Sequence, residues 1–423
     1  MKMENGKWKM EPPGRARFSI FDSRFSRLAV LFVAAAGCAD TAGPATPSGS
    51  FSVHADFPGG SARVEALDAA KRFVAVSPAR HPDRGWECWW YFRLDGLTPG
   101  ETVTLEIRGN HVATAEHAVV SGDGRTWRPI GGAEKKAGVV RFRHRAAGPS
   151  AWFAWGPPYL LRHAQEAVRR AAARSPHAVP FILCRSRGGR EVPAVRVSEP
   201  GEPGARRAGV WIHARQHAWE AGSSWIADGF LDWLVSDVPE AVRLRRTAEI
   251  VVVPVTDIDS VEDGAGGKLQ KPQDHSLDWA GEPHWPEVRA AQEQLGTMAA
   301  AGRLDLYVDL HNPGPQAKAI EFYVPPDEAL TPAQRDGLRR LLDLAKVEMT
   351  GPVPFLGATV ITGPGYVQDW NQMAKIWVTR KAPAAVATTM EVPWNTPHSL
   401  PEDYRRIGER FGCLVAGWVG GRK

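Results

Sequence analysis

The stretch WIHARQHAWEAGSSWIADGFLD (residues 211–232) decides the fold, because a short apolar strand ends within it and a helix begins. Residues 207–212 (RAGVWI) have the pattern of a buried strand, and the apolar spacing of residues 223–234 predicts the helix. His217 and Glu220 lie at the junction, three residues apart, so an imidazole nitrogen and a carboxylate oxygen can reach one cation. Zinc suits this pair of ligands. The alternative is a turn histidine followed by an acid that the helix dipole favours, so the assignment depends on residues further along the chain.

Length and composition indicate a globular protein. The chain has 423 residues, of which 43% are hydrophobic, enough for a large core and two or three domains. Its formal charge of +5 comes from dispersed arginines, so the sequence does not indicate a nucleic-acid-binding surface. Four cysteines are too few for a disulfide-rich fold, although one disulfide among Cys88, Cys184 and Cys413 is compatible with the sequence.

The N-terminus has the features of an export signal. The apolar run LAVLFVAAAG (residues 28–37) is shorter than the roughly 20 residues of a membrane-spanning helix, and a Thr-, Ala- and Pro-containing linker (residues 39–50) follows it. The motif AAGC resembles a bacterial lipoprotein cleavage box, in which Cys38 would carry the lipid and attach the protein to a membrane. We therefore expect residues 1–38 to be a signal peptide and the protein to be periplasmic, anchored at the outer membrane or extracellular. Lipid anchoring and simple secretion both stay open.

The remaining chain divides into two patterns. Residues 51–156 contain short β-type runs, such as RFVAVSPA, WWYFRL and TVTLEIRG, separated by turns with Gly, Asp and Pro, which predicts an antiparallel β-sandwich domain. In residues 157–423, apolar strands alternate with amphipathic helices, which predicts an α/β domain with helices on both faces of its sheet and functional residues at the strand ends. Helices are expected at residues 160–175, 223–235, 285–301 and 331–349.

Two further segments carry residues with the chemistry of a zinc hydrolase. His311 follows the apolar strand LYVDL as His217 follows AGVWI, so two histidines and Glu220 make a three-ligand set, which catalytic zinc sites combine with a bound water. Asp309 can orient a ligand imidazole, and a strand-terminal acid making a turn is the alternative. Zinc-water hydrolysis also needs a general base. Glu391 in AVATTMEVPW is the candidate, because a carboxylate in so apolar a strand is costly without a metal or hydrogen bonds.

Taken together, these segments resemble the zinc carboxypeptidase family, most closely its cytosolic-carboxypeptidase-like branch. The resemblance runs from about residue 51 to 411 and includes, in order, WWYFRL, WFAWGPPY, ARQHAWEAGSSWIADGFLDWL, VVVPVTDIDSVEDG, DLH and TTME. It implies a mixed central sheet flanked by helices, one Zn²⁺ per chain and hydrolysis of a peptide or related amide bond. It also implies zinc binding by His217, Glu220 and His311, with Glu391 as the general base.

One segment, DHSLDW (residues 274–279), departs from the family pattern Asp-x-Asn-Arg-x-Trp, whose Asn and Arg hold the substrate's terminal carboxylate. Ser276 and Leu277 occupy those places, and a leucine side chain cannot replace a bidentate guanidinium. Tyr366 is the candidate for the family's substrate-contacting tyrosine. We expect Ser276, Tyr366 and Lys268 to contact the substrate. Lys271 and Arg380 are further candidate cations, and all three cations are more typical of surface residues than of a ligand clamp.

Three functions are compatible with this pattern. The first is metallocarboxypeptidase-like hydrolysis of a peptide. The second is a catalytically weak or inactive descendant that binds a peptide or glycan-peptide ligand, which the loss of the Asn-Arg pair favours and the retention of the ligand set disfavours. The third is an amidase or endopeptidase that acts on substrates without a free C-terminal carboxylate.

Overall fold

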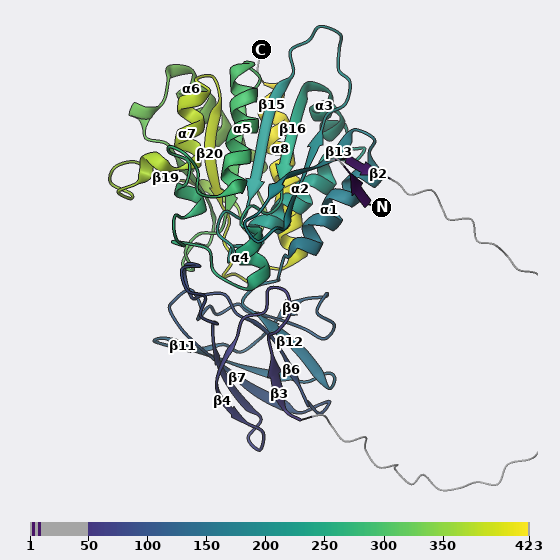
Figure 1. The fold of residues 1–423 in the computed structure, drawn as a ribbon, viewed down its shortest axis with the longest axis vertical. Coiled ribbons are helices and arrows are strands. Elements are labelled where there is room, and N and C mark those ends of the chain that lie inside the picture. Colours follow the sequence, from purple (N-terminus) through teal and green to yellow (C-terminus); the bar gives the residue numbers. More distant parts are fainter. Residues whose placement is uncertain (1, 5–6, 10–49, 422–423) are drawn as a thin grey trace, which may run out of the picture.

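The computed structural model describes residues 2–4, 7–9 and 50–421, which are arranged in a smaller β-rich unit and a larger α/β unit (Figure 1). The apolar run at residues 28–37 and Cys38 lie outside the described residues. Near the start of the chain, β1 (Lys2–Glu4) and β2 (Lys7–Lys9) pair antiparallel. Within the described ranges, no helix is both long and apolar enough to cross a bilayer.

The smaller unit contains two five-stranded sheets. Its strands are β3 (Ser52–His54), β4 (Arg63–Asp68), β5 (Phe73–Ser77), β6 (Tyr91–Asp95), β7 (Thr102–Arg108), β8 (Val119–Ser121), β9 (Arg128–Pro129), β10 (Glu134–Lys136), β11 (Val139–Arg145) and β12 (Ser150–Ala154). The sheet orders are β10-β11-β7-β5-β4 and β3-β6-β12-β8-β9. The predicted antiparallel sheets are present, with one difference. Strands β5 and β7 run parallel, because the chain between them crosses to the other sheet to form β6.

The larger unit is built on an eight-stranded sheet. Its strands are β13 (Ala178–Arg185), β14 (Glu191–Val197), β15 (Ala208–Ala214), β16 (Ala248–Val253), β17 (Leu306–His311), β18 (Ile320–Val324), β19 (Phe355–Ile361) and β20 (Val386–Glu391). Their order is β13-β14-β16-β15-β17-β20-β18-β19. Strands β16, β15, β17 and β20 are parallel, whereas β13, β14 and β18 introduce antiparallel pairs. The mixed sheet confirms the predicted fold class.

Helices cover both faces of this sheet (Figure 1). They are α1 (Leu161–Arg174), α2 (Ala221–Leu234), α3 (Pro239–Thr247), α4 (Ile258–Asp263), α5 (Pro286–Ala300), α6 (Pro332–Glu348), α7 (Ala374–Lys381) and α8 (Pro401–Gly420), with short 3-10 turns η1 (His275–Leu277), η2 (Asp327–Ala329) and η3 (Trp370–Gln372). Alternate residues of β20 point to opposite faces. Thr389 contacts Lys375 of α7, whereas Val386 contacts Gly337 of α6. The α6 face also carries α2, α3 and α8, and α5 packs near α7.

The two units meet through an aromatic cluster. Trp155, which follows β12, has its ring centroid 5.2 Å from that of Trp219 and 3.9 Å from that of Trp394, both in the larger unit. Trp86 stacks on Trp219 with centroids 6.3 Å apart. The tryptophan-rich segment of the smaller unit therefore serves as core and interface packing, which is the expected role of such residues at a strand.

Backbone hydrogen bonds extend the same interface towards the loop that precedes η1. The N–H of Trp86 donates to Lys268 O over 2.9 Å, and the N–H of Gly267 donates to Arg84 O over 2.9 Å. A side chain at Gly85, which has positive φ, would collide with the backbone of Gly267 and Lys268. The smaller unit thus fixes the conformation of residues 265–271, which line part of the site described below.

Four predicted helices form close to their expected limits, as α1, α2, α5 and α6. The longest described helix, α8, was not predicted, because Gly408 and Gly412 lower its intrinsic helix propensity. Close packing of α8 against α2 explains why glycines occur at these positions. A Cβ at Gly408 would lie 2.2 Å from the backbone oxygen of Ile226 in α2, so glycine is what allows α2 and α8 to approach this closely.

This contact predicts opposite effects for two glycine-to-alanine substitutions. Helix propensity alone would make Gly408→Ala stabilising, but overpacking against α2 should instead destabilise the protein by about 1–3 kcal/mol. Gly296→Ala in α5 is the matched control, because a Cβ there meets nothing within 4 Å, and it should stabilise by about 1 kcal/mol. Urea unfolding followed by tryptophan fluorescence measures both. A midpoint for Gly408→Ala equal to or above that of the unsubstituted protein would contradict the packing argument.

Candidate metal centre

Three side chains converge where the parallel strands end. His217 follows β15, Glu220 immediately precedes α2, and His311 is the last residue of β17. One ligand atom of each lies within 4.8 Å of the others, and all three residues are buried. Glu220 bridges the histidines, with Oε1 2.8 Å from His217 Nδ1 and Oε2 2.7 Å from His311 Nδ1. Burial raises the pKa of Glu220, but the two histidines outweigh burial and hold this pKa at about 2.

Strand register explains why residues distant in the sequence meet here. In the parallel pair β15 and β17, His213 lies opposite Asp309, and in the pair β17 and β20, His311 lies opposite Glu391. Successive residues of a strand point to opposite faces, so Asp309, His311 and Glu391 share one face of the sheet. Side chains from three strands therefore reach one site at the carboxyl edge, as expected for an α/β sheet.

Each histidine has its second ring nitrogen held by an acid. His311 Nε2 lies 2.9 Å from Asp309 Oδ2, and His217 Nε2 lies 3.1 Å from Asp274 Oδ1. Asp309 also accepts a hydrogen bond of 2.6 Å from Gln216 Nε2. Burial raises the pKa of both aspartates, but the adjacent histidines outweigh burial, so each pKa falls well below its usual range. These acids leave both Nδ1 atoms facing Glu220.

Asp309 lies where it can orient His311, which is the position predicted for it. The equivalent contact between Asp274 and His217 was not predicted. Asp274 is fixed by the N–H of Leu269 over 2.7 Å and by the N–H of Ser276 over 2.8 Å. Its signal was present in the sequence, since it is the first residue of the DHSLDW segment. A contact between this aspartate and His217 cannot be inferred from its position in the sequence, because the two residues are 57 positions apart.

The arrangement fits a zinc ion. Two imidazole nitrogens and one carboxylate are the ligand types of three-ligand catalytic zinc sites. Carboxylates on the far nitrogens fix ring orientation and increase ligand basicity, which is the usual support for zinc-bound histidine. Neutral Nδ1 atoms and an ionised Glu220 would hold the metal in this cluster.

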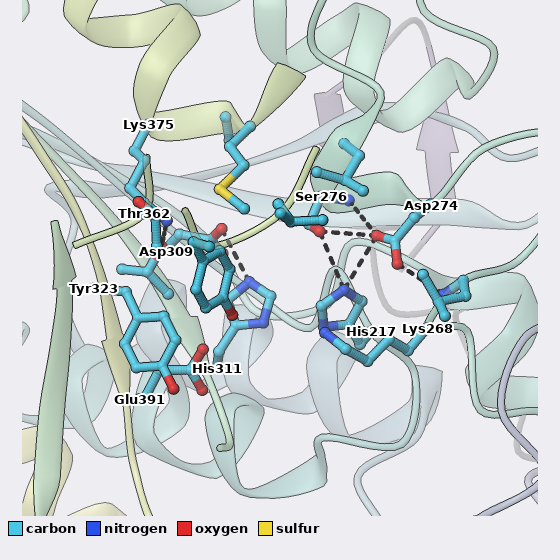
Figure 2. A pocket seen from close by; sticks show the side chains of 17 residues that line it. His217, Lys268, Asp274, Ser276, Asp309, His311, Tyr323, Thr362, Lys375 and Glu391 are labelled. Carbon is cyan, nitrogen blue, oxygen red and sulfur yellow. Dashed lines mark hydrogen bonds and ion pairs between the residues drawn. The ribbon is translucent and has the colours of Figure 1, made fainter. Parts of the chain in front are cut away.

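A cavity of about 330 Å³ opens beside the cluster, and Figure 2 shows its lining side chains. Glu391, the last residue of β20, lies in its wall near His311. Its Oε2 atom is buried and has no hydrogen-bond partner among the described residues. Burial raises the pKa of Glu391 to about 7, with Glu220 adding to the shift and His311 opposing it. A carboxylate in this state can take up and release a proton near neutral pH.

The candidate substrate-contacting residues do not all reach the cavity. Ser276, Leu277, Lys268 and Tyr366 line it. Lys268 holds its Nζ 5.6 Å from the centroid of the Trp86 ring, so the smaller unit contributes to this wall.

Two of the three candidate cations lie outside the cavity, as surface residues. Lys271 is exposed and pairs with Asp83 over 3.1 Å, which draws it towards the smaller unit. Arg380 is exposed on the outer side of α7, where it donates to the backbone oxygen of Asn371 over 3.3 Å. Neither lines the cavity.

Sequence reasoning also missed Lys375 and Tyr323, both of which line the cavity. Lys375 projects from α7, and its Nζ donates to Thr389 Oγ1 over 2.9 Å. Burial lowers the pKa of Lys375 to about 8. No sequence signal distinguished this residue, because α7 was not predicted and a helical lysine is usually exposed.

The three described cysteines, Cys88, Cys184 and Cys413, are free thiols, so the disulfide considered from the sequence does not form among them. Cys88 is buried in the smaller unit, Cys184 lies in β13 and Cys413 in α8.

Comparison with known proteins agrees with this geometry. Residues 165–266 match the family described as zinc carboxypeptidase, and residues 53–155 match the cytosolic carboxypeptidase N-terminal domain. The two matched stretches lie one in each unit, so each unit is similar to a domain of cytosolic carboxypeptidases or zinc carboxypeptidases. The resemblance inferred from the sequence is thereby confirmed.

Several cytosolic carboxypeptidases match part of the chain. Cytosolic carboxypeptidase 2 of Danio rerio is 33% identical over 121 residues, which cover 27% of this chain and 17% of the relative. Human cytosolic carboxypeptidase 1 is 28% identical over 189 residues, covering 41% of this chain and 15% of the relative. The chain therefore aligns with less than a fifth of the length of these relatives.

Solved structures share the fold over most of the chain. A metallo-carboxypeptidase from Burkholderia cenocepacia has a TM-score of 0.76 at 20% identity, covering 88% of this chain and 99% of that structure. A metallo-carboxypeptidase from Pseudomonas aeruginosa, in complex with (2-guanidinoethylmercapto)succinic acid, has a TM-score of 0.74 at 21% identity, covering 87% and 99%. Both units of the described chain thus follow an arrangement found in bacterial metallocarboxypeptidase structures.

The contact between Asp309 and His311 predicts a defect in metal binding. Asp309→Asn keeps the shape but removes the charge that orients and polarises the ring, so zinc should bind about 10- to 100-fold more weakly. Competition with a chromophoric chelator measures the affinity. Asp336→Asn, which removes a charge from the exposed face of α6, is the control and should leave the affinity unchanged. Unchanged zinc affinity in Asp309→Asn would show that this acid does not support the site.

Proposed function

We propose that the protein is a zinc-dependent hydrolase that cleaves a peptide or related amide bond in the cavity beside His217, Glu220 and His311. The observation that carries this proposal is the buried, unpartnered Oε2 atom of Glu391 in the wall of the same cavity. A buried carboxylate without hydrogen bonds destabilises the folded protein, so such a group in a native structure indicates a functional role. Zinc in this family supplies Lewis-acid polarisation of the scissile carbonyl and lowers the pKa of water.

The residues of the chain would then bind the substrate and transfer the proton. Glu391, with a pKa near neutrality, accepts the proton of the attacking water and returns it to the leaving amine. Ser276, Lys268 and Tyr366 line the cavity where the substrate would lie. Asp309 and Asp274 keep the two histidines in place through the nitrogens that face away from Glu220. The proposed partner is accordingly a peptide or amide substrate.

The amidase or endopeptidase alternative is favoured by Leu277, which lines the cavity and cannot bind a carboxylate. A catalytically inactive binding protein is disfavoured, because all three ligands and Glu391 remain in a geometry suited to hydrolysis. Export, with or without a lipid on Cys38, stays a proposal that is supported by the N-terminal sequence alone.

Metal content and turnover test the proposed function together. The purified protein should hold about one zinc per chain. His217→Ala and His311→Ala should lose the metal and all activity. Glu391→Gln should keep the metal, because Glu391 is outside the ligand set, while the turnover of a peptide library falls about 10²- to 10⁴-fold. Elemental analysis and product detection by mass spectrometry measure these quantities.

Three results would contradict the proposal: absence of zinc under metal-replete conditions, zinc without turnover of any amide, or full activity in Glu391→Gln. Comparison of free-acid and C-terminally amidated versions of each peptide separates the enzyme classes. Equal or faster cleavage of the amidated series would identify an amidase or endopeptidase.

The pKa of Glu391 predicts the acid limb of the pH profile. Because a base must be ionised to accept a proton, activity should be present above this pKa and lost as the pH falls through it. Burial raises the pKa to about 7, and a nearby cation lowers it, so the midpoint of the acid limb of kcat/KM should lie at or below about pH 7. Initial rates between pH 4 and 9 measure it. A rate that does not fall on acidification would exclude Glu391 as the base.

A further inference from the structure

The cavity contains one buried ammonium, that of Lys375, which forms no ion pair with any residue that the structure describes. Lys375 is 5% exposed, and among the described residues its ammonium makes a single hydrogen bond, to the neutral Thr389 Oγ1. An ammonium has three donors, so two are left unused. No described carboxylate forms an ion pair with it, although the side chain lines the cavity (Figure 2).

Lys375 differs in this respect from Lys268, the other lysine of the cavity. Burial disfavours the charged form of Lys268, but Asp274 and Glu220 outweigh burial and raise its pKa. The face of the Trp86 ring adds a further favourable contact. The charge of Lys268 is therefore already offset within the protein, whereas for Lys375 burial is the dominant influence.

Two carboxylates of the cavity lie close enough to favour the charged form of Lys375, those of Asp309 and Glu391, but neither forms an ion pair with it among the described residues. Asp309 is held by His311, His213 and Gln216. Burying an ammonium without a partner is costly, so proteins seldom keep such a group unless a ligand completes it. The cavity thus presents a positive charge on the α7 side and, at Leu277, no charge where the family's guanidinium would stand.

We propose that Lys375 is the anion-binding residue of this cavity and that its ammonium binds a carboxylate on the leaving portion of the substrate. The inference rests on the proposed hydrolytic function for the identity of the substrate, but binding itself does not require turnover. The carboxylate has two sources, the free C-terminus of a peptide or the side chain of a terminal Asp or Glu. Leu277 then packs against apolar atoms, and the cation comes from α7 instead of η1.

Calorimetric titration tests this assignment in the full-length, zinc-loaded protein carrying Glu391→Gln, so that ligands are not consumed. The ligands are acetyl-Ala-Ala-Ala as the free acid, the same peptide as the amide, and acetyl-Ala-Ala-Glu amide. Adding Lys375→Met should weaken binding of a carboxylate-bearing ligand about 10- to 100-fold and leave the Ala amide unchanged. Lys375→Arg should retain most of the affinity.

Two further variants control for changes in packing and in net charge. Lys375→Gln removes the charge but keeps a donor for Thr389, so it should behave as Lys375→Met even if the latter disturbs packing. Arg380→Met makes the same change in net charge on the exposed side of α7 and should have no effect. Thermal melting verifies that each variant is folded.

The pattern of affinity loss across the three ligands identifies which carboxylate Lys375 binds. Loss confined to the free acid identifies the C-terminal carboxylate, and loss confined to the Glu amide identifies the side chain. Unchanged affinity for both carboxylate ligands, equal weakening of all three ligands, or no binding of carboxylate ligands to the parent protein would overturn the assignment. Failure of the proposed function is distinguishable, because it shows as absence of turnover with Glu391 present, while the titrations still report on Lys375.

Discussion

Glu220 lies between the Nδ1 atoms of His217 and His311, in an interior where an unpaired carboxylate is strongly disfavoured. This contact requires both rings to keep one orientation, and each ring is held by an acid on its other nitrogen. Asp309 can do this because it lies two residues before His311 on β17 and points to the same face. Asp274 has no strand to place it. It depends on the loop of residues 265–271 and on the backbone N–H groups that fix its carboxylate.

The loop in turn depends on the smaller unit, which explains why a β-rich domain accompanies the site. Residues 83–86 make backbone hydrogen bonds with residues 267–271, and Trp86 packs against both Trp219 and Lys268. The aromatic cluster around Trp155 buries a large apolar area between the units, so separating them would expose tryptophan and release the loop. The smaller unit is therefore part of the framework of the cavity.

The sequence predicted those features that depend on local pattern. The helix α2 and the strands before His217 and His311 have regular apolar spacing, and the ligand set follows from residues at their ends. The helices α7 and α8 were missed for physical reasons. In α8 the glycines are needed for close packing on α2, which opposes the local propensity for helix. The sequence could not decide which of Lys268, Lys271 and Arg380 lines the cavity, because the direction of a loop or helix side chain depends on tertiary contacts such as that of Lys271 with Asp83.

Glu391 and Lys375 show a shared consequence of burial. Burial raises the pKa of the acid to about 7 and lowers that of the base to about 8, so each group is pushed towards its neutral form. A cation near Glu391 and an anion near Lys375 would reverse both shifts. Protonation and ligand binding are linked. A ligand that places an opposite charge beside one of these groups stabilises its ionised form, and this interaction increases the affinity for the ligand. With the proposed function, a ligand whose carboxylate reaches α7 while its scissile bond lies beside the histidines would be favoured in this cavity. We therefore expect selection for an anionic substrate even though Leu277 occupies the place of the guanidinium in the family pattern.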